Sequence, residues 1–250
     1  MTLSQTDFER FAAACDEAEK RQRAAGGIGT LGERTLHAAL KLYYEPNTDF
    51  HEVGVGRFVA DIKNESGITE IQTRGFHLLR AKLEAFLPLG RVTVVYPLAA
   101  RKQIYTVDAE SGEILSGRKS PRRETPLDIL PELNRILPFL QNENLSFRLP
   151  LLEVAEYRRP GGRRWRNGTT RLERLPLALF DEVVLGGKSD YYALLPETLP
   201  SPFTTAEFAK AAKRNRRFAQ TVLRVLTELC VTERCGKDKN AYLYRIRPEK

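Results

Sequence analysis

Two carboxylates and an amide occur in one short stretch at a spacing that could bring them together. Asp61, Glu70 and Gln72 lie within Gly56–Thr73, where β-rich runs flank the turn-forming residues 63–67. Asn and Gly tolerate the positive φ of a tight reversal, so the pattern predicts a β-hairpin. Side chains alternate along a strand, so Glu70 and Gln72 share a face, and the turn can bring Asp61 beside them. Such oxygen ligands, completed by water, hold hard divalent cations.

A third carboxylate, Glu33, precedes the hairpin on a helix that we expect to run from about Thr30 to Tyr44. Glu33 falls on the apolar stripe of that helix, which includes Leu36 and Leu40. Burying a carboxylate without a cation or hydrogen-bond donors is expensive, so Glu33 would need a partner there. The alternative is that it lies at the edge of the stripe in the first turn, where a negative charge suits the helix dipole. The helix alone favours this alternative.

The elements that must position these side chains follow one another in a mixed α/β order. We expect helices over 6–24, 30–44, 75–87, 127–140 and 172–185, and strands over 50–55, 58–62, 68–72, 91–97, 103–108, 113–115 and 147–157. Apolar, β-branched runs such as 91–97 are typical of strands buried on both faces. A proline-rich connector at 194–202 indicates a boundary between a first domain, 1–197, and a second, 198–250.

The net charge of +8 is unevenly distributed along the 250 residues. Residues 201–250 carry twelve Lys and Arg against five Asp and Glu, which gives +7, and the remainder carries 28 against 27, which gives +1. A basic terminal domain suggests a polyanion partner, first of all nucleic acid. A second basic cluster, with a solvated loop as its simplest interpretation, consists of Arg158, Arg159, Arg163, Arg164, Arg166, Arg171 and Arg174.

The composition excludes several other classes of protein. No apolar run approaches the ~20 residues of a membrane span, and the polar N-terminus is not a signal peptide. Three cysteines are too few and too badly spaced for a disulfide framework or a zinc site. The histidines, His37, His51 and His77, lack metal-ligand spacing and are expected to be structural or at the surface. We therefore expect a cytoplasmic protein.

The last fifty residues resemble a winged helix domain. Phe203 and the capping box Thr204–Glu207 open a short helix through Ala212, and a polar turn leads into a second helix over 218–230. A basic hairpin of strands 231–234 and 241–247 follows. In such domains the second helix enters the major groove and the wing touches the backbone. The resemblance therefore implies DNA contacts from Arg214, Asn215, Arg216, Arg217, Gln220, Thr221 and Arg224, and phosphate contacts from Lys237 and Lys239. The alternative is a winged helix used for protein contacts or dimerisation.

Residues 30–97 resemble the PD-(D/E)XK nuclease superfamily, to which many restriction enzymes belong. The core of that superfamily is a helix, a three-stranded meander, a helix and a further strand, and the order expected here matches it. Asp61 stands for the family's aspartate, Glu70-Ile71-Gln72 for its E-x-K element, and Glu33 for the helical glutamate of many members. The chain departs from the family at Gln72, where lysine is usual, although some active members use E-x-Q. The fold implied is a restriction-endonuclease-like mixed sheet flanked by helices, followed by the winged helix-turn-helix domain.

The resemblance implies metal-assisted hydrolysis of phosphodiester bonds. Asp61 and Glu70 would hold Mg²⁺ or Mn²⁺, which lowers the pKa of an attacking water and neutralises developing charge. Gln72 would orient the water or the phosphate, and Glu33 would be an outer or second-metal ligand. We thus expect an endonuclease of double-stranded DNA, with a role in restriction or defence, in which the winged helix selects the DNA. Cutting both strands would need a homodimer or two visits by one copy.

Two rival hypotheses remain open at this point. The first is a DNA-binding protein or regulator on a degenerate nuclease core, without catalysis. The second is an interaction component of a defence system, in which the Arg158–Arg174 segment contacts a partner protein.

Overall fold

The structure is a computed structural model that describes residues 3–24, 34–108, 111–162 and 165–248. The chain divides into two compact units. The first comprises Met1–Thr73, Val95–Thr125 and Arg148–Val183, and the second Arg74–Val94, Pro126–Phe147 and Val184–Lys250. Residues 198–250 lie entirely in the second unit, together with earlier segments. Among the described residues, no helix combines the length and the apolar character that crossing a bilayer requires.

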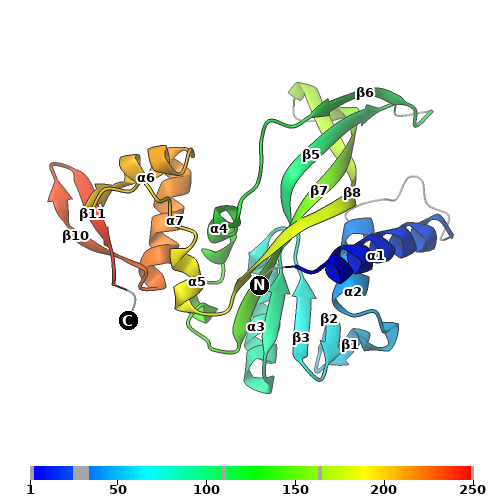
Figure 1. Ribbon diagram of the computed structural model, residues 1–250, viewed down its shortest axis with the longest axis horizontal. Helices are drawn as coiled ribbons and strands as arrows, with labels where there is room; N and C mark the ends of the chain where they lie inside the picture. Colours follow the sequence, from blue (N-terminus) through cyan, green and yellow to red (C-terminus); the bar gives the residue numbers. More distant parts are fainter. Residues whose placement is uncertain (1–2, 25–33, 109–110, 163–164, 249–250) are drawn as a thin grey trace. The chain divides into compact units, whose positions relative to one another are not determined.

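Within the part of the chain that the structure describes, eight strands form one mixed sheet (Figure 1). Its order is β1-β2-β3-β4-β7-β5-β6, and β8 pairs with β7. The bounds are β1 His51–Val55, β2 Phe58–Asn64, β3 Gly67–Ile71, β4 Val92–Val95, β5 Leu98–Val107, β6 Ile114–Lys119, β7 Leu145–Gly162 and β8 Trp165–Leu185. The expected mixed α/β architecture, a large mixed sheet flanked by helices, is confirmed.

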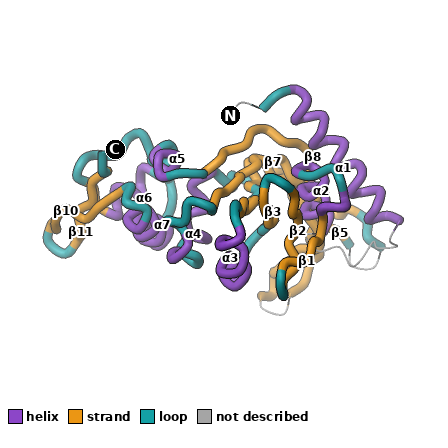
Figure 2. The backbone as a smooth tube through the Cα atoms, turned by 90° about the horizontal axis from the view of Figure 1, so that it is seen from below, coloured by secondary structure: helices purple, strands orange, loops and turns teal. Residues whose placement is uncertain are grey.

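Two helices cover the first strands of the sheet. Helix α1, Gln5–Ala24, and helix α2, Arg34–Tyr44, lie side by side in both views (Figures 1 and 2). Their apolar residues share one core with strand residues of the first unit, among them Phe11, Leu36, Leu40, Tyr43, Ile62, Ile71, Val95, Leu152 and Leu179. Helix α2 is described from Arg34 onward, so the predicted start near Thr30 lies outside the described residues.

The predicted hairpin forms between β2 and β3. Its antiparallel register pairs Ile62 with Thr69 and Asn64 with Gly67. Apolar residues of the two strands, Ile62 and Ile71, are buried in the core of the first unit. The alternation that the sequence indicated therefore places this hairpin in a half-buried sheet.

The expected helix over 172–185 is wrong, because these residues belong to the long strand β8. Leu175, Leu177 and Leu179 alternate with other residues, as in a strand, and Pro176 does not begin a helix there. Pairing with the distant strand β7 decides the conformation of this segment. The Arg158–Arg174 segment, expected as a loop, is accordingly built largely from the ends of β7 and β8.

The segments of the second unit that precede residue 198 contain several short helices. They are η2 Phe76–Leu79, α3 Arg80–Phe86, η3 Leu87–Leu89, η4 Pro126–Ile129, α4 Leu130–Leu133, η5 Leu137–Phe139 and α5 Lys188–Tyr192. The single helix expected over 127–140 is therefore wrong. Pro131 and Pro138 interrupt it, since proline lacks an N–H and is tolerated only in a first turn. The 3-10 segment η1, Thr48–Phe50, lies in the first unit.

The last fifty residues contain two helices and a small three-stranded sheet. The elements are β9 Phe203–Thr204, α6 Thr205–Ala211, α7 Arg216–Glu228, β10 Thr232–Asp238 and β11 Ala241–Ile246, with the sheet order β10-β11-β9. The predicted capping box is present, because Thr204 accepts from the Glu207 N–H and Glu207 accepts from the Thr204 N–H. The Phe203 ring contacts Phe208 at 6.1 Å between centroids, and it completes the hydrophobic staple.

Candidate functional site

Asp61 and Glu70 meet across the β2–β3 hairpin. Continuing the register by one pair places Asp61 opposite Glu70. Asp61 Oδ2 accepts a hydrogen bond from the Ile71 N–H at 2.8 Å, and Glu70 Oε1 lies 3.4 Å from the Asp61 backbone nitrogen. Glu70 is buried, with 2% of its surface exposed. The two carboxylates that the sequence singled out are therefore neighbours.

A third carboxylate, Glu52, extends this acidic row on the other side. The β1–β2 register pairs His51 with Ile62 and Val53 with Ala60, so Glu52 stands opposite Asp61. The backbone of Glu52 has a φ of +53°, an uncommon value for a non-glycine residue. Glu52, Asp61 and Glu70 thus form an acidic row across the neighbouring strands β1, β2 and β3.

Two basic side chains of helix α2 face the acidic row. His37 Nε2 lies 3.2 Å from Asp61 Oδ2, and Lys41 Nζ lies 2.7 Å from Glu52 Oε1. The hydrogen bond from Lys41 lowers the pKa of the Glu52 carboxyl. His37 and Lys41 are four residues apart and so lie on one side of the helix. The acidic row is therefore paired with the side of α2 that carries these two residues.

The sequence analysis did not assign His37 to this site. A signal was present, because His37 follows Glu33 by four residues and would share its helix face. Glu33 itself lies outside the described residues. The Gln72 backbone N–H donates to the Val95 carbonyl at 2.9 Å, which fixes the backbone of this residue at the end of β3.

Two of the residues predicted to hold a metal ion, Asp61 and Glu70, are neighbours, and their oxygens have partners within the protein. Among the residues that the structure describes, no group of three or more His, Cys, Asp or Glu is arranged to hold a metal ion. Asp61 Oδ2 is engaged by an N–H and by His37, and the Glu52 carboxylate by Lys41. A hard cation needs six or more oxygen ligands, many from open carboxylates or water.

A second candidate site is the exposed side of helix α7. The side chains of Arg216, Arg217, Gln220 and Arg224 are all exposed, whereas Val222, Leu223, Val225 and Leu226 are buried. Three of the four exposed positions carry a guanidinium. The spacing of Arg217, Gln220 and Arg224 by three and four residues puts them on one helix face. This face can donate hydrogen bonds to anionic or polar groups in a groove.

The start of α7 is held by its own side chains. Asn215 is the N-cap, and its Oδ1 accepts from the Phe218 N–H at 2.8 Å. Arg214 binds Asp128, with 2.6 Å between Nη2 and Oδ2 and 3.4 Å between Nε and Oδ1. Thr221 Oγ1 donates to the Arg217 carbonyl. Arg214, Asn215 and Thr221, which the sequence analysis assigned to DNA contacts, thus each make a hydrogen bond within the second unit.

The turn between α6 and α7 closes with a Schellman motif. The N–H groups of Lys213 and Arg214 donate to the carbonyls of Lys210 and Ala209, at 3.1 and 2.9 Å. Lys213 is left-handed, with a φ of +51°, as this motif requires. The turn therefore sets the angle at which α7 leaves α6.

The β10–β11 hairpin is exposed and cationic near its tip. Lys237 and Lys239 are exposed, and Lys237 is paired in register with Tyr242. The Tyr242 ring lies 4.9 Å from Lys237 Nζ and 4.3 Å from the Arg234 guanidinium carbon. Two cations thus flank one half-exposed aromatic ring on this hairpin.

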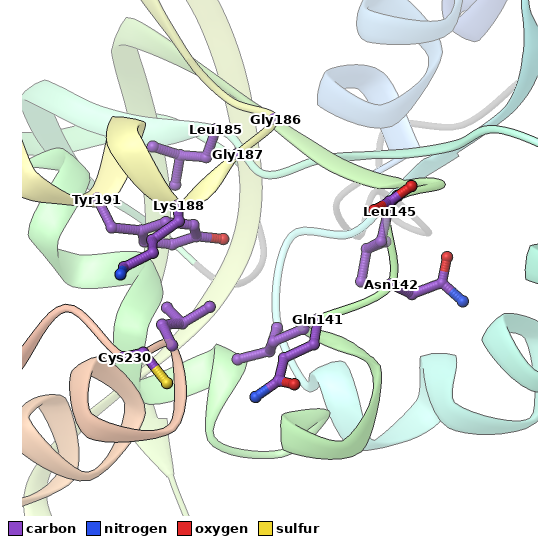
Figure 3. Close-up of a pocket in the computed structure, with 12 residues that line it drawn as sticks. Gln141, Asn142, Leu145, Leu185, Gly186, Gly187, Lys188, Tyr191 and Cys230 are labelled. Carbon is purple, nitrogen blue, oxygen red and sulfur yellow. The ribbon is translucent and has the colours of Figure 1, made fainter. Parts of the chain in front are cut away.

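A pocket of about 320 Å³ in the second unit contains none of the residues that the sequence singled out (Figure 3). Several of its polar groups are engaged within the protein. The N–H groups of Gly186 and Gly187 both donate to Asp190 Oδ2, and Gln141 donates to the Glu228 carbonyl at 3.0 Å. Burial raises the pKa of the Tyr191 hydroxyl, which keeps it neutral. The pocket therefore offers mainly apolar surface.

Comparison with known proteins gives a family without an activity. The family model described as "Domain of unknown function (DUF8091)" matches residues 34–186. An "Uncharacterized protein" of Treponema pallidum (strain Nichols) is 37% identical over 123 residues. That alignment covers 49% of this chain and 49% of the relative, so the chain matches about half the length of this curated protein. No solved structure matches the chain.

Proposed function

The chain belongs to the DUF8091 family, and we propose that it is a protein that binds double-stranded DNA through residues 203–246. The exposed face of α7, with Arg216, Arg217, Gln220 and Arg224, is the observation that carries this proposal. These residues follow a tight turn after α6, as in a helix-turn-helix, and the β10–β11 hairpin corresponds to a wing. The family match covers residues 34–186 and does not include residues 203–246. The proposal therefore rests on the geometry of residues 203–246.

The winged helix assignment is supported by the order of the small sheet. β11 lies between β10 and β9, so the hairpin is tied to the strand that opens α6. The Tyr244 ring lies 6.1 Å from the Phe203 ring, which connects the hairpin to the helices. A rigid base of this kind would hold a wing beside the second helix.

The proposed contacts follow from the chemistry of each side chain. Arg217 and Arg224 would donate to guanine edges or phosphates, and Gln220 would suit adenine. Lys237 and Lys239 of the hairpin would contact the backbone. The surplus of seven positive charges in residues 201–250 supplies the long-range attraction.

The proposal is tested by fluorescence anisotropy with a labelled duplex of mixed sequence. The variant Arg217→Gln/Arg224→Gln should bind at least about 30-fold more weakly, since each lost contact is worth roughly 1–3 kcal/mol. Lys63→Gln, an exposed lysine on β2, is the control and should change affinity less than twofold. Equal affinity of the double variant and the control would rule the proposal out.

A second proposal is that the first unit is an endodeoxyribonuclease of the PD-(D/E)XK type that depends on Mg²⁺ or Mn²⁺. It is supported by the neighbouring Asp61 and Glu70 and by the strand order β1-β2-β3-β4 with a helix before the meander. Against it stands the pairing of Asp61 Oδ2 with His37 Nε2 at 3.2 Å. A decayed core that leaves a regulator without catalysis is the alternative.

Cleavage of methylated and unmethylated supercoiled plasmid in Mg²⁺ and in Mn²⁺ separates the two. A nuclease should nick or linearise the plasmid, and Asp61→Ala and Glu70→Ala should abolish this while duplex binding persists. Binding without cleavage by the unmodified chain would leave the DNA-binding function and reject the nuclease.

A further inference from the structure

The pocket of about 320 Å³ in the second unit contains none of the residues that we propose to contact DNA (Figure 3). Its apolar walls come from the C-caps of η5 and α7, the start of β7 and the end of β8. Each of these contributes a leucine, namely Leu140, Leu229, Leu145 and Leu185. The last three are buried. A concave site of this volume with apolar walls is in the range that holds a small organic molecule.

One polar group of the pocket, the Tyr191 hydroxyl, differs from its neighbours. The N–H groups of Gly186 and Gly187 donate to a carboxylate of the same segment. Tyr191 is 4% exposed, yet its hydroxyl makes no hydrogen bond with any residue that the structure describes. The hydroxyl of the adjacent Tyr192, in contrast, donates to the Pro248 carbonyl at 3.5 Å. Tyr191 thus leaves a donor unused in the pocket.

The orientation of Tyr191 makes this donor available to a ligand. In Figure 3 its hydroxyl points from α5 towards the interior of the pocket. Burial raises the pKa of the hydroxyl, so it keeps its proton at neutral pH and can donate. A buried donor without a partner costs free energy, and an acceptor on a ligand removes that cost. The pocket therefore favours a ligand that combines an apolar body with one acceptor.

The two charged residues that line the pocket have opposite signs. Lys188 and Glu143 are both exposed, so water and salt screen their charges. The buried leucines and the neutral Tyr191 add no charge. Since the lining has no net formal charge, it favours an uncharged ligand over an ionised one.

We propose that this pocket binds a small uncharged molecule with an apolar body and a carbonyl-type acceptor, which receives the hydrogen bond of Tyr191. An apolar cavity of about 150 Å³ holds benzene, so a volume of about 320 Å³ suits a molecule of one or two rings. The leucines contact the apolar body, and Tyr191 fixes the orientation of the carbonyl. This site does not depend on DNA binding by α7, because the two involve different residues.

Ligand-observed NMR titration of the full chain tests the proposal with two probes of similar shape, acetophenone and isopropylbenzene. Only acetophenone carries an acceptor, and we expect it to bind with a Kd of about 1 mM or lower. Tyr191→Phe removes only the hydroxyl, and Tyr192→Phe is the matched control at the next residue. The two probes differ in their transfer from water, so the quantity compared between proteins is the ratio of their Kd values. The ratio of isopropylbenzene to acetophenone should fall about fivefold in Tyr191→Phe and change less than twofold in Tyr192→Phe.

The proposal is overturned if neither probe binds at millimolar concentration, or if Tyr191→Phe gives the same ratio as the unmodified chain. Intermolecular NOEs decide the question if Tyr191→Phe does not fold. Acetophenone in the pocket should give NOEs to the methyl groups of Leu185 and Leu229 in the unmodified chain. NOEs instead to Leu78 and Leu89, which are exposed and do not line the pocket, would place the probe elsewhere and overturn the proposal.

Discussion

Arg214 should stabilise the second unit through its ion pair with Asp128, so replacing Arg214 should lower the free energy of unfolding. The pair has 2.6 Å between Nη2 and Oδ2, and the side chains of Arg214 and Asp128 are 24% and 7% exposed. Removing one partner of a fully buried pair costs roughly 3–5 kcal/mol. Because a quarter of Arg214 is exposed to solvent, we expect Arg214→Ala to lower the free energy of unfolding by about 2 kcal/mol. Asp128→Asn should cost less, since an amide oxygen still accepts.

Thermal and urea unfolding measure this effect. A loss of about 2 kcal/mol corresponds to a fall in Tm of roughly 4–8 °C. Arg217→Ala is the matched control, because it is exposed and should change stability by less than about 0.5 kcal/mol. A cycle with Asp128→Ala should give a coupling energy well above zero. If Arg214→Ala unfolds like Arg217→Ala, the structural role of this residue is refuted.

Three further changes have defined outcomes. Cys230 follows α7 with a φ of +57° in a second Schellman motif, so Cys230→Gly should raise stability by up to ~1 kcal/mol in urea unfolding, whereas Cys230→Ala should not. Asn215→Ala removes the N-cap of α7 and should cost about 1 kcal/mol in the same assay, while Asn215→Asp should keep most of it. The hydrogen bond from Lys41 lowers the pKa of the Glu52 carboxyl below its ordinary 4.5. Glu52→Gln should therefore be less stable than the unmodified chain at neutral pH, and this difference should vanish as the pH falls through the native pKa of Glu52. A difference in Tm between the two proteins that grows on acidification would contradict this sign.

Local patterns predicted the parts of the fold that depend on neighbouring residues. The turn chemistry at 63–67 and the flanking β-branched residues predicted the β2–β3 hairpin. The pair Thr204 and Glu207 predicted the start of α6, and both side chains make the expected hydrogen bonds. Each of these signals acts within a few residues, where propensity and capping decide the backbone.

The features that the local patterns missed depend on contacts between segments far apart in the chain. Leu172–Leu185 has enough apolar residues for a helix, yet it pairs with β7 as a strand. Glu156 gave no sequence signal, because two of its three cations, Lys102 of β5 and Arg174 of β8, come from other strands. The convergence of Asp61 and Glu70 was predicted because one turn connects them, whereas the pairing of Asp61 with His37 depends on how α2 packs on the sheet.

The salt dependence of duplex binding tests most directly whether α7 contacts DNA. The slope of log Kd against log salt should be steep for the unmodified chain and shallower by about two in Arg217→Gln/Arg224→Gln, with weaker binding at every salt concentration. Lys63→Gln should follow the unmodified chain. A double variant whose curve coincides with that of the unmodified chain would contradict the account.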